Sequence, residues 1–172
     1  MDDTEGSAAD AELFAFAKLG RVVPFPSDDA LLCIGDMEVR YEIHERDGRY
    51  ELQRRERSGS ARVIVSSAEL GVVRRVLIQQ IGVNVRARQR LRRVVLPIAE
   101  SALPSAFILD EGVGGGVELR WADAGEDRSA SFPAGPGGSQ QAVKLSRYAS
   151  ASEHELIASL LDVAGRPLFK VG

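Results

Sequence analysis

One run of alternating apolar and charged residues, "EVRYEIHER", constrains the fold of this chain more than any other feature. Val39, Tyr41 and Ile43 recur at every second position, which is the period of a strand with one buried face. Asp47 and Gly48 follow, a pair favoured in two-residue hairpin turns, and "RYELQRRER" then returns as a partner strand. The sequence therefore predicts an antiparallel hairpin.

Helices are predicted on either side of this hairpin. A short helix is expected in "AELFAFAKLG", capped near Asp10 and ended by Gly20, after a flexible tail over residues 1–9. Ser66 and Glu69 form a capping-box pattern, and apolar residues recur at helical spacing after it.

That second pattern predicts a helix over residues 67–81 that ends at Gly82 and turns Arg74 and Arg75 toward solvent. A further capping box, from Ser152 to Glu155, predicts a final helix. After that helix, "AGRPLF" is expected to fold back.

The remaining stretches read mainly as strands. "ARVIV", "AFIL", "VELRW", "RSASF" and "AVKLS" are candidate strands, and "DEGVGGG" and "PAGPGGSQQ" are candidate turns. A length of 172 residues suits one domain. We therefore expect an α+β fold over residues 10–172, a single domain with a mainly antiparallel β-sheet and about three α-helices.

Few residues carry the side-chain chemistry of an enzyme. The histidines are His44 and His154, neither in a metal-binding spacing, and the only cysteine, Cys33, lies in an apolar run. A Cys33–His44 dyad is conceivable, but packing explains both residues better. The sequence thus predicts no catalytic, metal-binding or cofactor-binding residue, and a protein that is not an enzyme. A single cysteine and no apolar run near 18 residues favour a cytoplasmic protein without a membrane span.

The glycine run "GVGGG" at residues 112–116 lacks both the GxGxxG spacing and a following helix, so it does not predict a dinucleotide site. A hairpin loop is the better interpretation, and such a loop can approach a partner protein closely because glycine has no side chain. Trp121, two residues after Leu119, is expected in the core rather than stacked on a ligand.

Charge is spread unevenly along the chain. Residues 54–93 hold 11 arginines and two acidic residues, whereas both flanks are acidic. Nucleic-acid binding by this segment is disfavoured because no aromatic residue is interleaved between Arg57 and Arg93. We expect the arginines of "NVRARQRLRRVVLP" to decorate a helix-to-strand connection or pair with acids, with "VVLP" entering the sheet. Contact with a protein partner stays open as an alternative.

Two stretches, "IGVNVRARQRLRRVVLP" and "VKLSRYASASEHELIASLLDVAGRPLF", resemble the actinobacterial immunity-protein family 61 of polymorphic toxin systems, also called the TNT antitoxin family. The layout is similar over nearly the whole chain. In the first stretch the family has Ile-Arg and Gly-Leu-Pro where this chain has Val85-Arg86 and Arg90-Leu91-Arg92. The family-like residues of the second stretch are Val143, Leu145, Ser146, Ser152, Glu155, Gly165, Arg166, Pro167, Leu168 and Phe169.

The resemblance implies a non-enzymatic inhibitor that binds a cognate NAD-hydrolysing toxin domain one to one and blocks its active site. A site that accepts NAD must accommodate a pyrophosphate, so we expect it to be electropositive and to attract acidic loops. The residues expected to bind the toxin are Asp110, Glu111, Gly112, Val113, Gly114, Gly115 and Gly116, followed by Asp123, Glu126 and Asp127. An adaptor or secretion chaperone, or a nucleic-acid binder using residues 54–93, remains the alternative.

Overall fold

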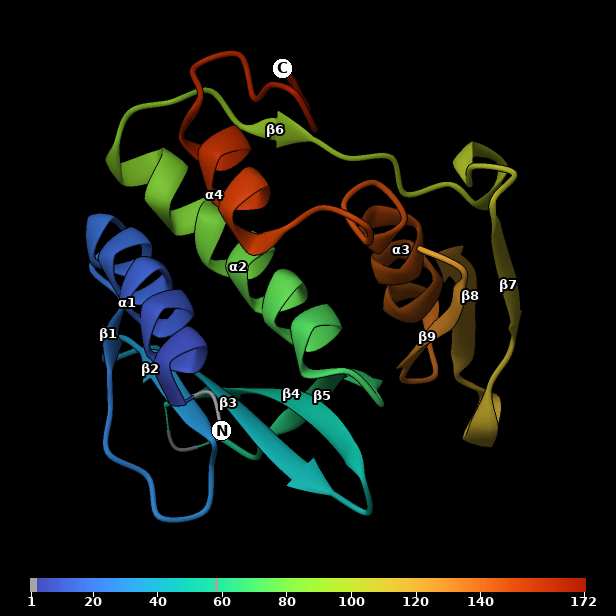
Figure 1. Ribbon diagram of the computed structural model, residues 1–172, viewed down its shortest axis with the longest axis horizontal. Coiled ribbons are helices and arrows are strands. Elements are labelled where there is room, and N and C mark those ends of the chain that lie inside the picture. The colour runs from blue at the N-terminus through green and yellow to red at the C-terminus, as the bar shows by residue number, and fades with distance from the viewer. Residues whose placement is uncertain (1–2, 58) are drawn as a thin grey trace.

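In the described part of the chain, four α-helices lie on the concave side of a curved, eight-stranded antiparallel sheet (Figure 1). The computed structural model describes residues 3–57 and 59–172. The predicted α+β class and the mainly antiparallel sheet are confirmed, with one helix more than expected in the described residues. The elements are α1 (Asp3–Leu19), β1 (Val23–Pro24), β2 (Leu32–Gly35), β3 (Val39–Arg46), β4 (Arg49–Glu56), β5 (Arg62–Ser67), α2 (Leu70–Arg88), β6 (Val94–Val95), β7 (Phe107–Glu111), β8 (Val117–Asp123), β9 (Glu126–Phe132), α3 (Pro136–Leu145), α4 (Glu153–Leu161) and β10 (Lys170–Val171).

The hairpin predicted from the alternating pattern is formed by β3 and β4. Asp47 and Gly48 make its turn with φ angles of 51° and 72°, the left-handed values that a tight hairpin needs. Ile43 lies opposite Leu52 and both are buried, so this cross-strand pair fixes the register.

The sheet runs in the order β1-β2-β3-β4-β5-β9-β8-β7, and its two halves meet at a narrow joint. Ser66 of β5 and Ser131 of β9 are the only paired residues between the halves in the described chain. Pro133, which has no N–H to donate, follows β9 directly, and Gly135 (φ 108°) then turns the chain into α3. Residues 62–64 of β5 are therefore left without a neighbour strand on that side.

Helix α2 is the centre of the core and packs between α1 and α4 (Figure 1). Its buried apolar residues recur at helical spacing and contact the concave face of β4 and β5. They are Val72, Val73, Val76, Leu77, Ile78, Ile81 and Val85.

The predicted bounds of α2, residues 67–81, are wrong at both ends. Ser66 does not cap the helix, because it lies in β5 and its Oγ accepts a hydrogen bond from Arg49 Nε at 3.1 Å. Gly82 does not end it, because the helix continues to Arg88. An added Cβ at Gly82 would lie 2.8 Å from Leu160 Cδ1, so this glycine permits close packing of α2 on α4.

Helix α1 is longer than predicted, since residues 3–9 are helical where a flexible tail over 1–9 was expected. Residues 1–2 lie outside the described residues. Ala8 and Ala9 are strong helix formers, and the carboxylate of Asp10 binds Arg74 of α2 instead of capping the helix. The predicted end before Gly20 is confirmed.

The segment "AVKLS" is not a strand, because it forms the second half of α3 and its end. Ala142, Val143 and Leu145 are fully buried, and α3 packs on β8 and β9. A short apolar run of this kind has no periodicity that separates strand from helix. Gly138 also belongs to this helix, and a Cβ there would lie 2.3 Å from the carbonyl oxygen of Pro133.

The C-terminal predictions are largely confirmed. Ser152 caps α4, since its Oγ accepts a hydrogen bond from the N–H of Glu155 at 3.1 Å. The chain then folds back, and β10 pairs with β6 in a separate two-stranded sheet, so "VVLP" does not enter the main sheet.

In the described residues no helix is long and apolar enough to cross a membrane.

Candidate functional site

The glycine run forms the hairpin loop between β7 and β8, as predicted. The N–H of Gly112 donates to the carbonyl of Gly116 at 2.8 Å and closes the loop. Gly114 and Gly115 adopt φ angles of 67° and 78°, which side chains rarely tolerate. The side chain of Val113 is fully exposed, so the loop presents one apolar side chain on a thin glycine backbone.

The two acidic residues of this hairpin differ in their surroundings. Asp110 forms an ion pair with Arg120 of the neighbouring strand, which offsets its charge. No cation of the described residues lies within 4.0 Å of the Glu111 carboxylate. Glu118, which lies opposite Asp110 in β8, also has no cation within 4.0 Å among the described residues, so the free negative charge at this end of the sheet comes from Glu111 and Glu118.

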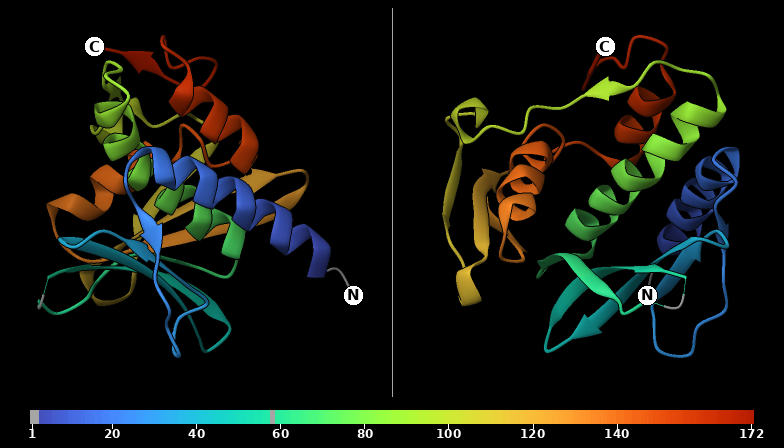
Figure 2. Two further views of the ribbon diagram at one scale, coloured as in Figure 1. Left: turned by 90° about the vertical axis from the view of Figure 1, so that its left-hand side faces the viewer. Right: turned by 180° about the vertical axis from the view of Figure 1, so that it is seen from behind.

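Asp123, Glu126 and Asp127 lie at the other end of the same strands, around the β8–β9 turn. Strand β8 separates the two ends, and its seven residues correspond to about 20 Å. The structure thus does not bring the two predicted acidic groups together. Both belong to the half of the sheet that ends at β7, far from α1 (Figure 2).

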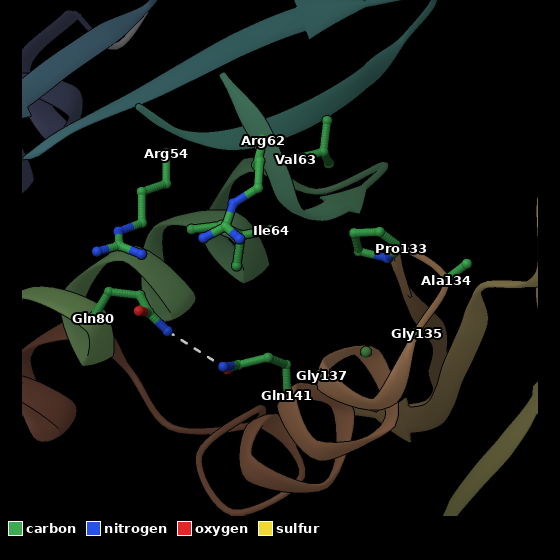
Figure 3. A pocket seen from close by; sticks show the side chains of 11 residues that line it. Arg54, Arg62, Val63, Ile64, Gln80, Pro133, Ala134, Gly135, Gly137 and Gln141 are labelled. Carbon is green, nitrogen blue, oxygen red and sulfur yellow. Dashed lines mark hydrogen bonds between the residues drawn. The ribbon is translucent and has the colours of Figure 1, made fainter. Parts of the chain in front are cut away.

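A pocket of about 510 Å³ opens on the helical side of the sheet, where β5 and β9 diverge (Figure 3). Arg54 and Arg62 point toward it from β4 and β5, and the amides of Gln80 and Gln141 meet across it at 3.5 Å. Its lining residues are Arg54, Arg62, Val63, Ile64, Gln80, Pro133, Ala134, Gly135, Gly137, Gly138 and Gln141.

This pocket adjoins the glycine hairpin. An added Cβ on Gly115 would lie 3.9 Å from the Cβ of Ala134, a lining residue, and one on Gly116 would lie 2.4 Å from the carbonyl oxygen of Phe132. The tip of the β7–β8 hairpin and the pocket are therefore neighbouring parts of one surface. No sequence motif marked the pocket, because its walls come from segments up to 87 residues apart (Arg54 to Gln141).

The arginine-rich segment does not form one basic surface. Arg86, in the last turn of α2, is 1% exposed and donates hydrogen bonds to backbone carbonyls. Burial lowers the pKa of its guanidinium, and the nearby Asp162 opposes that shift. The expected surface position is thus wrong for Arg86.

Arg74 is not turned to solvent either. Its side chain is 11% exposed and binds Asp10 of α1 and Glu153 of α4, so it joins three helices. Burial alone would lower the pKa of Arg74, but hydrogen bonds to Glu153 and Asp10 raise it on balance. Arg75 is also partly buried, and its Nε has no hydrogen-bond partner in the described residues.

The histidines and the cysteine occupy separate environments. Cys33 is 6% exposed, and burial raises the pKa of its thiol, which disfavours the nucleophilic thiolate. His44 contacts the carbonyl of Asp29 and the carboxylate of Glu42, and His154 lies 2.7 Å from a carboxylate oxygen of Glu12. No hydrogen bond joins Cys33 to His44 among the described residues, and none of these side chains there belongs to a metal-binding cluster.

Trp121 packs in the core, as expected, together with Leu119 on the same face of β8. Its ring lies 5.7 Å from the ring of Phe107, centroid to centroid, in a tilted arrangement.

The described residues thus form an α+β domain with an exposed glycine hairpin beside a pocket. The model of the family immunity protein 61 matches residues 15–168, and the chain belongs to this family. The resemblance seen in the sequence is thereby confirmed, and the family implies an antitoxin that binds a cognate toxin.

A solved structure, Rv3902c from M. tuberculosis, is similar to this protein with a TM-score of 0.78. The two chains are 21% identical, and the match covers 93% of this chain and 92% of that chain. At this identity the likeness shows a shared fold. A comparison with curated proteins finds no match.

Proposed function

We propose that this protein is a non-enzymatic antitoxin of the cytoplasm that binds one copy of a cognate, NAD-hydrolysing toxin domain and blocks its active site. The observation that carries the proposal is the family match over residues 15–168. Inhibition of this kind requires only a surface that fills or covers the toxin's site, with an interface on the order of 1,600 Å² in total. It requires no reacting group on the antitoxin.

The β7–β8 hairpin is the part best shaped to enter such a site. Gly112, Gly114, Gly115 and Gly116 keep the loop thin, and Val113 supplies an exposed apolar side chain at its tip. A thin backbone can approach the floor of a narrow cleft more closely than side chains allow.

Electrostatic attraction would also help to orient the hairpin toward the active site of the toxin. A site that holds a pyrophosphate is electropositive, and Glu111, directly before the glycine loop, is an unpaired carboxylate among the described residues. Asp110 contributes less because Arg120 already neutralises it. Asp123, Glu126 and Asp127 form a second choice at the opposite end of the strands.

The test is co-expression with the toxin domain encoded by the neighbouring reading frame. We expect growth and cellular NAD to be preserved, and the two proteins to co-purify as a 1:1 complex. Depletion of NAD in the presence of excess antitoxin would reject the proposal. A catalytic contribution from the antitoxin is checked separately by mixing it with NAD and the inactivated toxin, where we expect no turnover.

A further inference from the structure

The pocket between β5 and the β9–α3 turn combines a free strand edge with unneutralised positive charge. Arg62 and Val63 pair with β4 on one side, and Ile64 lies at a register shift of that ladder. In the described residues the pairing of β5 with β9 is confined to Ser66 and Ser131, so residues 62–64 have no neighbour strand on the other side. This edge lies at the pocket, which residues 62–64 line, and a free sheet edge of this kind can accept another strand.

Arg54 and Arg62 lie directly opposite each other in the β4–β5 ladder, an arrangement that like charges make unfavourable. Arg54 is bound by Glu56 at 2.8 Å, although its Nε has no hydrogen-bond partner in the described residues. Arg62 has no carboxylate within 4.0 Å among the described residues, and no acidic side chain lines the pocket. A carboxylate placed here would relieve the repulsion between the two arginines.

Two other pairs of arginines face each other in the described part of this sheet. Arg46 faces Arg49, which donates to Ser66, while Arg46 is exposed and has no carboxylate within 4.0 Å among the described residues. Arg40 faces Arg55, but Arg55 contacts Glu42 and Arg40 lies over the ring of Phe25. Arg46 and Arg62 are thus the arginines of these facing pairs to which the described residues supply no carboxylate, and of these two only Arg62 lines this pocket.

We propose that this pocket receives an extended, acidic segment of the partner toxin, which pairs with the free edge of β5 and places a carboxylate between Arg54 and Arg62. This inference rests on the proposed antitoxin function and extends its interface from the hairpin tip, across Ala134, to the strand edge. The exposed side chain of Val63 offers an apolar contact to the same segment. One partner then meets a negative group at Glu111 and positive groups at Arg54 and Arg62, which fixes its orientation.

The experiment compares Arg62→Glu with Arg92→Glu in binding to the inactivated toxin domain of the neighbouring reading frame. Both residues are exposed, and both changes alter the charge equally, but Arg92 lies beyond the far end of α2 from the pocket. We expect Arg62→Glu to weaken the affinity at least about tenfold and Arg92→Glu to leave it nearly unchanged. An acidic-to-arginine change in the toxin segment should restore binding to Arg62→Glu, and thermal melting checks that both variants fold.

Hydrogen exchange on the wild-type complex gives a second readout. The amides of residues 62–64 that face away from β4 should become protected when the toxin binds. The strand-edge inference would be overturned if Arg62→Glu bound the toxin as tightly as the wild type, or if both variants lost affinity equally. In either case, neutralisation of the toxin by the wild type would still support the antitoxin function. Failure of the wild type to bind or neutralise the toxin would reject both.

Discussion

The guanidinium of Arg86, in the last turn of α2, donates a hydrogen bond from Nη1 to the backbone carbonyl of Leu160 at 2.7 Å. The same side chain binds the carbonyls of Arg92 and Asp162 at 2.6 and 2.8 Å. Carbonyls at the end of a helix lack internal partners, and a cation is favoured there. Arg86 therefore holds the end of α4 and the segment after α2 in one buried arrangement.

Arg86→Met is expected to lower the free energy of unfolding by about 2–4 kcal/mol, because it leaves several carbonyls unpaired in a buried place. Arg92→Met, six residues along and exposed, is the matched control and should change stability by less than about 0.5 kcal/mol. Urea denaturation measures both. Equal stability of the two variants would show that the buried hydrogen bonds of Arg86 contribute nothing net.

Two glycines of α2 should respond to alanine in opposite directions. Gly82→Ala is expected to destabilise the protein by about 1–3 kcal/mol, because the new methyl group would collide with Leu160. At Gly71 the nearest atom to an added Cβ is Arg75 Nη1 at 3.6 Å, an ordinary contact. Gly71→Ala should therefore stabilise by up to about 1 kcal/mol through helix propensity. Thermal unfolding compares them, and a stabilising Gly82→Ala would contradict the close packing of α2 on α4.

Turn and capping patterns in the sequence correctly predicted the elements that depend only on contacts between neighbouring residues. The turn at Asp47 and Gly48 and the cap at Ser152 need only neighbouring residues, and both were predicted correctly. The capping box at Ser66 has the same spacing, but Arg49 from the adjacent strand engages its side chain. Helix α2 therefore begins at Leu70 rather than directly after Ser66. The sequence pattern of a single segment cannot reveal such a tertiary contact.

The same reason limits what could be predicted of the site. Arg86 was expected on the surface, but its carbonyl partners Leu160 and Asp162 come from the other end of the chain. The pocket arises because Pro133 ends the pairing of β9, which matters only once β5 is known to be its neighbour. The glycine hairpin was predicted as a loop from its composition, while its role in binding the toxin stays a prediction.

The two serines of the capping-box patterns provide a direct test. Ser152→Ala removes the acceptor for the N–H of Glu155 and should cost about 1 kcal/mol of stability. Hydrogen exchange should also accelerate in the first turn of α4. Ser66→Ala should leave exchange in the first turn of α2 unchanged, since Ser66 lies in β5. Faster exchange at the start of α2 in that variant would restore Ser66 as a cap.

Acid stability should depend in part on Asp162. Hydrogen bonds from the backbone N–H groups of Arg166 and Ala164 hold the pKa of this carboxyl below its usual value. The group therefore adds stability at pH values above its unfolded pKa of about 3.9, and this contribution is lost as pH falls through the lower folded pKa. Asp162→Ala should flatten the acid side of the stability profile. An NMR titration that finds an ordinary pKa for Asp162 would contradict this expectation.

The hairpin charge gives the last prediction, on association with the toxin. Glu111→Lys should slow association with the inactivated toxin domain several-fold at low salt, because the unpaired carboxylate beside the glycine loop would become a like charge facing an electropositive site. Glu126→Lys makes the same charge change in the second-choice acidic group, at the opposite end of the strands, and the comparison shows which of the two groups faces the toxin. Asp110→Asn should have the smaller effect, since Arg120 already offsets Asp110. Stopped-flow measurements at two ionic strengths distinguish long-range electrostatic attraction from direct contact by residue 111. Salt screens the long-range attraction, so added salt should bring the association rates of Glu111→Lys and wild type together. Slower association of Glu126→Lys than of Glu111→Lys would instead place the electropositive face of the toxin over the β8–β9 turn.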